Sequence, residues 1–122
     1  MVTLKSLDEN FPIQRQLGVD ASPVVLLNIF AVAAGDVAAL LEAWEHDANW
    51  MKKQPGYIST QLHRAVGESY VFMNYAVRES VAHFRNAFSH PDFRAALAAY
   101  PSSAVASPHL FEKVAIPNLC TR

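Results

Sequence analysis

Two polar residues, Asn74 and Arg78, stand four positions apart in "FMNYAVRES", residues 72–80, a stretch that begins like a buried strand and ends in Arg-Glu-Ser. Because the side chains of a strand alternate between its two faces, Asn74 and Arg78 are expected to project from the same face. A buried amide or guanidinium without a hydrogen-bonding partner costs about 1 to 3 kcal/mol, so each needs a partner in the protein or in a ligand. Two interpretations follow, a structural pair in which Arg78 bonds Glu79, Glu42 or Glu45, and part of a binding site.

Two further residues extend this candidate site. Asn28 is the only polar member of the run "VVLLNIFAV", so a second amide can face the same cavity from another strand. His63 lies on the predicted second strand, and its ordinary pKa near 6.5 suits a general base. The alternative for His63 is a partly exposed strand histidine without a catalytic role. The predicted catalytic residues are Asn74, Arg78 and His63.

Aromatic residues surround this face of the predicted sheet. Most of these rings are expected to form ordinary core, but any space left among them is apolar with a few convergent amides, as in small-molecule pockets. Such a pocket suits a flat aromatic ligand. The residues predicted to bind it are Asn28, Phe30, Trp44, Phe72, Phe84 and Phe88.

Other kinds of site lack support in the sequence. His46 follows Glu42, and His83 follows Glu79, at one helical turn, but two ligands do not make a metal site. The chain has no Gly-rich phosphate loop, no GxSxG motif, and no cysteine beside a base, since Cys120 stands in the tail. We therefore expect neither a metal nor a cofactor.

The elements that position these residues follow from hydrophobic periodicity. Strands are predicted over 24–32, 57–66, 70–77 and 109–116, with a turn at 67–69 between the second and the third. Helices are predicted over 36–53 and from Ser80 to Tyr100, the latter interrupted at Pro91. The order is β-α-β-β-α-β, which is typical of an α+β, ferredoxin-like fold: a four-stranded antiparallel sheet with both helices on one face.

The remaining organisation follows from composition. Residues 1–22 show no sustained period and are predicted to be an N-terminal arm, 23–117 the folded domain and 118–122 a tail. The first and third strands are apolar on both faces, whereas two helices cover only one. A homodimer with its sheets face to face buries the second face most simply.

The overall charge excludes some classes of partner. Ten Lys or Arg residues stand against eleven Asp or Glu, so the chain has no electrostatic footprint for nucleic acid. The sequence has neither an apolar run of about twenty residues, as a membrane helix needs, nor a segment typical of signal peptides. We therefore expect a cytoplasmic protein that binds neither nucleic acid nor membrane.

Four stretches of the chain form one combination: "VVLLNIF", "KKQPGYISTQLHR", "NYAVRESVAHFRNAF" and "HPDFRAAL". This combination resembles the antibiotic biosynthesis monooxygenase family of dimeric α+β barrels, from about residue 24 to 114. The family has a Pro-Gly-aromatic turn into its second strand, here 55–57. Its third strand ends like N-x-A-x-W-E-S before a helical aromatic, and Arg78 occupies the tryptophan position. The matching residues are Asn74, Ala76, Glu79, Ser80 and Phe84.

The resemblance implies a small monooxygenase that needs no cofactor. In such relatives a phenolic or anthrone substrate is deprotonated in the apolar cavity, and its anion reacts directly with dioxygen. Asn74 would donate a hydrogen bond to the developing oxyanion. Arg78 would hold a phenolate or carboxylate, or close the pocket.

The same resemblance allows other functions. One is a non-catalytic dimeric module that binds a small molecule or serves in a stress response, in which Asn28, Asn74 and Arg78 satisfy one another. A heme-degrading branch shares Asn28, but it uses a tryptophan at the position of Arg78. It also uses a histidine on the helix that here reads "DFRAALAAY". Heme degradation is therefore the least favoured of these functions.

Overall fold

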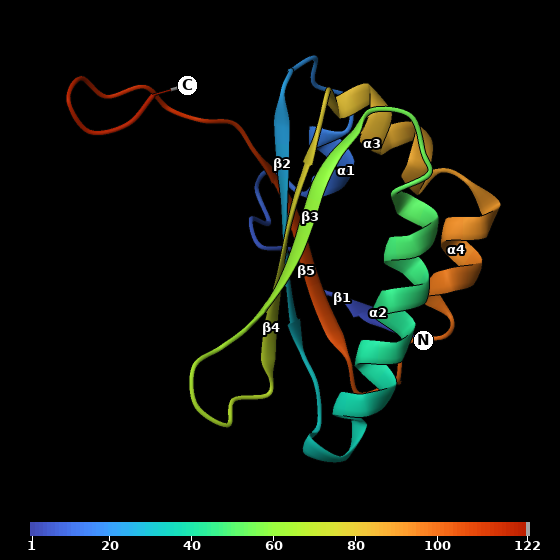
Figure 1. The fold of residues 1–122 in the computed structure, drawn as a ribbon. Helices are drawn as coiled ribbons and strands as arrows, with labels where there is room; N and C mark the ends of the chain where they lie inside the picture. The colour runs from blue at the N-terminus through green and yellow to red at the C-terminus, as the bar shows by residue number, and fades with distance from the viewer. Residues whose placement is uncertain (122) are drawn as a thin grey trace.

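The computed structural model describes residues 1–121 (Figure 1). Its elements confirm the predicted α+β, ferredoxin-like fold, with the second helix divided in two at Pro91. In chain order they are β1 (Thr3–Leu4), α1 (Ile13–Gln16), β2 (Val24–Ala31), a 3-10 turn (Ala34–Asp36), α2 (Val37–Met51), β3 (Tyr57–Arg64), β4 (Val71–Arg78), α3 (Val81–Phe88), α4 (Pro91–Leu97) and β5 (Val105–Phe111).

The sheet has five strands in the order β1-β5-β2-β4-β3, one more than the four predicted, because β1 adds to the edge of β5. Strands β2 to β5 pair antiparallel, and α2, α3 and α4 lie together on one face (Figure 1). Two apolar clusters lie between helices and sheet, one around Phe30, Leu40 and Phe72 and one around Leu26 and Phe84. The sheet and the three helices therefore form the two layers between which a site can be enclosed.

The N-terminal residues take part in this fold. Strand β1 pairs in parallel with β5, and Val2 is only 7% exposed within the first apolar cluster. Gln16 of α1 donates to the carbonyl of Leu110 at 2.9 Å and accepts from its backbone N–H at 2.9 Å. The sequence predicted an arm outside the core. Its missing periodicity reflects elements of two and four residues, which are too short to show one.

The last strand differs from its predicted position. Residues 105–108, predicted to be loop, begin β5, whereas 112–116 lie beyond its end. Small residues and two prolines hid the strand. Pro108 is tolerated because β1 pairs with β5 only at residues 105 and 106, so the proline lies on the edge of the sheet.

The face of the sheet opposite the helices carries partly exposed apolar side chains. Val71, Tyr75 and Phe111 are 37–41% exposed, and the C-terminal segment leaves the domain on this side (Figure 1). The homodimer expected at this face remains a prediction. Within residues 1–121, no helix is both long and apolar enough to span a bilayer.

The turn before β3 yields a first testable prediction. Gly56 has φ +84, and a Cβ built on it overlaps the imidazole ring of His83, whereas Gly67 has φ +82 with open space around it. A left-handed conformation costs an alanine about 1 to 2 kcal/mol at either position. Gly56→Ala is therefore expected to lower the free energy of unfolding by at least about 2 kcal/mol, and Gly67→Ala by about 1 kcal/mol. Urea unfolding of both variants tests the difference. Equal losses of stability would show that the overlap with His83 adds no cost at position 56.

Candidate active site

A cavity of about 360 Å³ lies between the sheet and the helices. One wall is formed by β2, β3 and β4, the opposite wall by α2, α3 and α4, and a further part by the N-terminal residues. The side chains that line it are mainly apolar, among them Phe30, Trp44, Phe84 and Phe88. An apolar enclosure with a few polar groups is the usual environment for a small aromatic molecule.

Two asparagines lie side by side on the sheet wall. Asn28 of β2 and Asn74 of β4 are register partners on neighbouring strands, and both line the cavity. The hydroxyl of Thr60 donates to Asn74 Oδ1 at 2.7 Å, which leaves the two N–H groups of the Asn74 amide free to donate to a ligand. Asn28 Oδ1 is buried and has no hydrogen-bond partner in the described part of the chain. The pair therefore brings amide donors to the cavity wall, together with one acceptor that no described residue satisfies.

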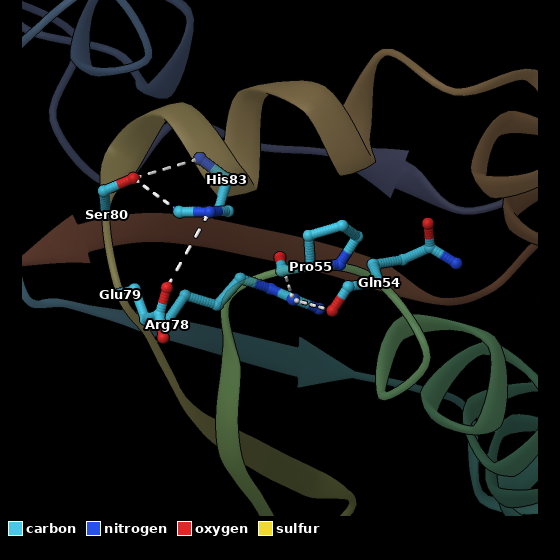
Figure 2. Close-up of polar contacts among 6 residues, drawn as sticks. All are labelled: Gln54, Pro55, Arg78, Glu79, Ser80 and His83. Carbon is cyan, nitrogen blue, oxygen red and sulfur yellow. Dashed lines mark hydrogen bonds and ion pairs between the residues drawn. The ribbon is translucent and has the colours of Figure 1, made fainter.

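Arg78 lies at the end of β4, where it meets the C-terminal end of α2. Its Nη2 donates to the carbonyl of Met51 at 2.7 Å. Figure 2 shows Nη1, which donates to the carbonyls of Gln54 and Pro55 at 3.4 and 3.3 Å. The predicted salt bridge to a glutamate is wrong, since the guanidinium bonds backbone carbonyls. Glu79 instead approaches His83, with Oε2 3.9 Å from Nε2.

These bonds explain how a cation is tolerated at this position. Arg78 is only 2% exposed, and its guanidinium carbon lies 5.6 Å from the Tyr57 ring centre and 5.3 Å from that of Phe84. Burial lowers the pKa of Arg78, but a guanidinium stays protonated at neutral pH. A positive charge at a helix C-terminus is favourable. Arg78 thus fastens α2 to β4 while it lines the cavity.

A carboxyl group lies on the helical wall. Asp47 of α2 lines the cavity, and its Oδ2 accepts a hydrogen bond of 3.0 Å from the hydroxyl of Tyr100. Asp47 Oδ1 is buried and finds no partner among residues 1–121. Burial raises the pKa of Asp47 to about 6, although the Tyr100 hydrogen bond and nearby His46 act in the opposite direction. Burial and the adjacent carboxylate raise the pKa of Tyr100 above its ordinary value.

Most of the predicted site residues line this one cavity. They are Asn28, Phe30, Trp44, Asn74, Arg78, Phe84 and Phe88. Phe72 is absent from the lining and is buried in the first apolar cluster. His63 is exposed, and its register partner is Met73, so strand alternation turns it to the face away from the helices. The prediction of His63 as a base in this cavity is therefore wrong.

Sequence reasoning missed three polar residues of the site. Thr60 was missed because threonine is common in strands, so nothing in the sequence marked it as the partner of Asn74. Asp47 was hidden because it occurs in the polar stretch "EHDAN" of an amphipathic helix, where a carboxylate normally faces water. Tyr100 was predicted only as the end of a helix, and its ring stacks on Phe30 with centroids 5.6 Å apart, which the sequence does not show. A polar residue at an inward helical position was the one available signal.

The cavity offers little for a metal. Throughout the described residues, no group of three or more His, Cys, Asp or Glu side chains is arranged to hold a metal ion. The charged side chains on the walls are Asp47, Arg78 and Arg94. The site can bind an apolar ring system, donate hydrogen bonds from amides and accept a proton on a carboxylate.

Comparison with known proteins decides the family. The model of the antibiotic biosynthesis monooxygenase family matches residues 23–99, the segment that contains β2 to α4 and most of the cavity wall. The chain belongs to this family. Antibiotic biosynthesis monooxygenases share the ferredoxin-like layers found here, so the resemblance seen in the sequence is confirmed.

Solved structures agree with this assignment. A proposed monooxygenase from Shewanella loihica PV-4 is 35% identical with a TM-score of 0.67, over 78% of this chain and 97% of that one. SnoaB, described as a cofactor-independent oxygenase from Streptomyces nogalater, is 24% identical with a TM-score of 0.72, over 80% of this chain and 99% of that one. Among proteins with curated descriptions, none matches the chain.

Proposed function

We propose that this member of the family oxidises an electron-rich aromatic small molecule, such as a phenol or an anthrone, with dioxygen and without a cofactor. The observation that carries the proposal is the apolar cavity with two asparagine amides opposite each other on its wall. Family membership supports the reaction class, and SnoaB offers a cofactor-independent example on the same fold. We further propose that the molecule is a cytoplasmic homodimer, paired through the open face of the sheet.

The reaction has a simple balance for an anthrone. The substrate loses a proton from its CH₂ carbon, and the resulting anion gives electrons to dioxygen as a C–O bond forms. The peroxide anion takes a proton, the carbon loses its second hydrogen as a proton, and the O–O bond breaks to give a C=O group. The departing hydroxide takes up a proton, so anthrone and O₂ become anthraquinone and water.

The protein contributes position and hydrogen bonds to this sequence. The apolar walls hold the ring system and exclude water, which strengthens every polar interaction inside. The amide N–H groups of Asn74 can donate to the enolate oxygen on which negative charge accumulates, because its Oδ1 is already occupied by Thr60. Catalysis then requires only dioxygen and a proton acceptor.

Replacement of Asn74 tests this assignment. We expect Asn74→Ala to lower kcat/KM for anthrone oxidation by about 100-fold, as removal of one oxyanion donor typically does. Its free energy of unfolding is expected to fall by only about 1 kcal/mol. The assay follows product mass under ¹⁸O₂, with no cofactor added, and the expected product carries one ¹⁸O atom.

A matched control is available in Asn86, which is exposed on α3 and outside the cavity. Asn86→Ala is expected to keep the wild-type rate. If no phenol or anthrone of a broad panel acquires ¹⁸O with the wild type, the oxygenase function is wrong. If Asn74→Ala loses stability without any effect of ligand, the protein is better described as a non-catalytic binding module.

A further inference from the structure

The carboxyl group of Asp47 is a chemical resource that the proposed function has not yet used. Of the described residues that line the cavity, Asp47 is the only carboxylate. The remaining titratable groups of the lining are Tyr57, Tyr100, Arg78 and Arg94. An arginine does not release its proton at neutral pH, and a buried tyrosine is protonated there. Asp47 is therefore the group on these walls that can accept a proton.

We propose that Asp47 takes the proton from the substrate, and that Tyr100 is the residue that positions it. This inference rests on the proposed function. It places the base on the helical wall, opposite the asparagine amides that would donate hydrogen bonds to the negatively charged substrate oxygen. The substrate then lies between a proton acceptor and an oxyanion donor, as proton abstraction next to a developing oxyanion requires.

The surroundings of Asp47 favour this role over a structural one. A carboxylate retained for stability normally has its oxygens paired, but Oδ1 of Asp47 is buried without a partner within residues 1–121. Oδ2 is held by Tyr100, whose ring is 2% exposed and stacked on Phe30 at an interplanar angle of 13°. One oxygen is thus fixed by a hydrogen bond, and the other has no hydrogen bond to give up when it takes a proton.

The charged neighbours leave Asp47 ionised but ready to accept a proton. From its own helix, His46 faces solvent beside it. Arg94 of α4 lines the same cavity, and Tyr100, three residues beyond the end of α4, donates to Asp47. From the sheet, Arg78 lines the cavity with its guanidinium bonded to carbonyls at the end of α2 and just beyond it. Burial is the largest influence and raises the pKa of Asp47 to about 6, close to the optimum for a general base at neutral pH.

The proton balance uses Asp47 twice and returns it unchanged. Asp47 first takes a proton from the CH₂ carbon of an anthrone, and dioxygen adds to the anion. The protonated carboxyl gives this proton to the peroxide anion. Asp47 then takes the second proton from the same carbon as the O–O bond breaks, and passes it to the departing hydroxide, which leaves as water.

Hydrogen exchange without dioxygen tests the first step alone. Anthrone is incubated with the protein in D₂O under anaerobic conditions, and deuterium at its CH₂ carbon is followed by mass spectrometry. The wild type is expected to exchange this position faster than buffer does. Asp47→Asn, which preserves an acceptor oxygen for Tyr100, is expected to slow the catalysed exchange at least 30-fold. Anthrone binding, followed by tryptophan fluorescence, is expected to change less than twofold.

Two further variants distinguish a base from a structural residue. Glu45→Gln removes an exposed carboxylate from the same helix and is expected to leave exchange unchanged. The pH profile of exchange is expected to rise through about pH 6 in the wild type. Because the Tyr100 hydrogen bond lowers the pKa of Asp47, Tyr100→Phe is expected to move this rise to higher pH.

The outcomes separate this inference from the proposed function. Exchange that persists in Asp47→Asn, or a wild type that catalyses no exchange, overturns the role of Asp47 even if the protein oxygenates anthrone. Exchange that depends on Asp47 but is followed by no ¹⁸O incorporation in air supports the base and overturns the oxygenase function.

Discussion

Arg78→Met is expected to lower the free energy of unfolding by about 3 kcal/mol. Methionine keeps much of the apolar stem but removes the donors that satisfy the carbonyls of Met51, Gln54 and Pro55. A hydrogen bond from a charged donor contributes about 1.5 to 3 kcal/mol, and part of this gain is offset because the guanidinium no longer has to be buried. For a domain of this size the loss corresponds to a fall in Tm of about 10 °C.

Chemical unfolding in urea at pH 7 measures this effect. Arg78→Lys retains the charge at the end of α2 but not the planar fork, so its stability is expected to lie between methionine and wild type. The exposed Lys113, outside the cavity lining, offers a control, and Lys113→Met is expected to change stability by less than about 0.5 kcal/mol. A methionine variant as stable as wild type would contradict the structural role of Arg78.

Asp47→Asn is expected to stabilise the protein above pH 7 while it removes the proposed base. The pKa of Asp47 in the fold, about 6, lies above its ordinary value of 3.8. Between these values the folded state binds more protons than the unfolded state, so wild-type stability falls as pH rises from about 4 to 6 and is level above. A shift of this size amounts to at most about 3 kcal/mol. Asparagine carries no charge, so the variant lacks this loss.

Urea unfolding at pH 4.5 and pH 8 distinguishes the two proteins. The difference in stability between wild type and Asp47→Asn is expected to be small at pH 4.5 and to reach about 1 to 2 kcal/mol in favour of the variant at pH 8. Glu45→Gln, altered at an exposed position of α2, is expected to follow the wild type at both values. Equal pH dependence of stability in wild type and Asp47→Asn would show that burial does not raise the pKa of Asp47.

Most of the fold was predictable because its main elements have regular hydrophobic patterns. The run 24–32 is almost continuously apolar, and helix α2 has both a clear apolar face and a Pro-Gly stop, so their limits were predicted within about two residues. Strand β5 broke the rule because Pro108 and a series of small residues look like loop when the edge position of the strand is unknown. Tertiary position, which no local window contains, decided that element.

The site was predictable where strands place it and less so where helices do. Alternation on β4 put Asn74 and Arg78 on one face, and the structure places both at the cavity. The same rule put His63 on the face of β3 opposite Leu62, where the structure has it, and only the catalytic role given to a residue of that face was wrong. Asp47 could not be predicted because its burial depends on which side of α2 is covered by the chain around α4. That contact joins segments about fifty residues apart.

Residues 1–22 form a part of the cavity wall that lies outside the segment matched by the family model. Val2, Leu4, Ile13 and Leu17 form part of its wall, yet all four precede the segment that the family model describes. Gln16 and the pairing of β1 fasten this segment to β5, the strand that follows the matched region. A change confined to the first twenty residues would therefore alter the extent of the cavity while β2 to α4 stay the same.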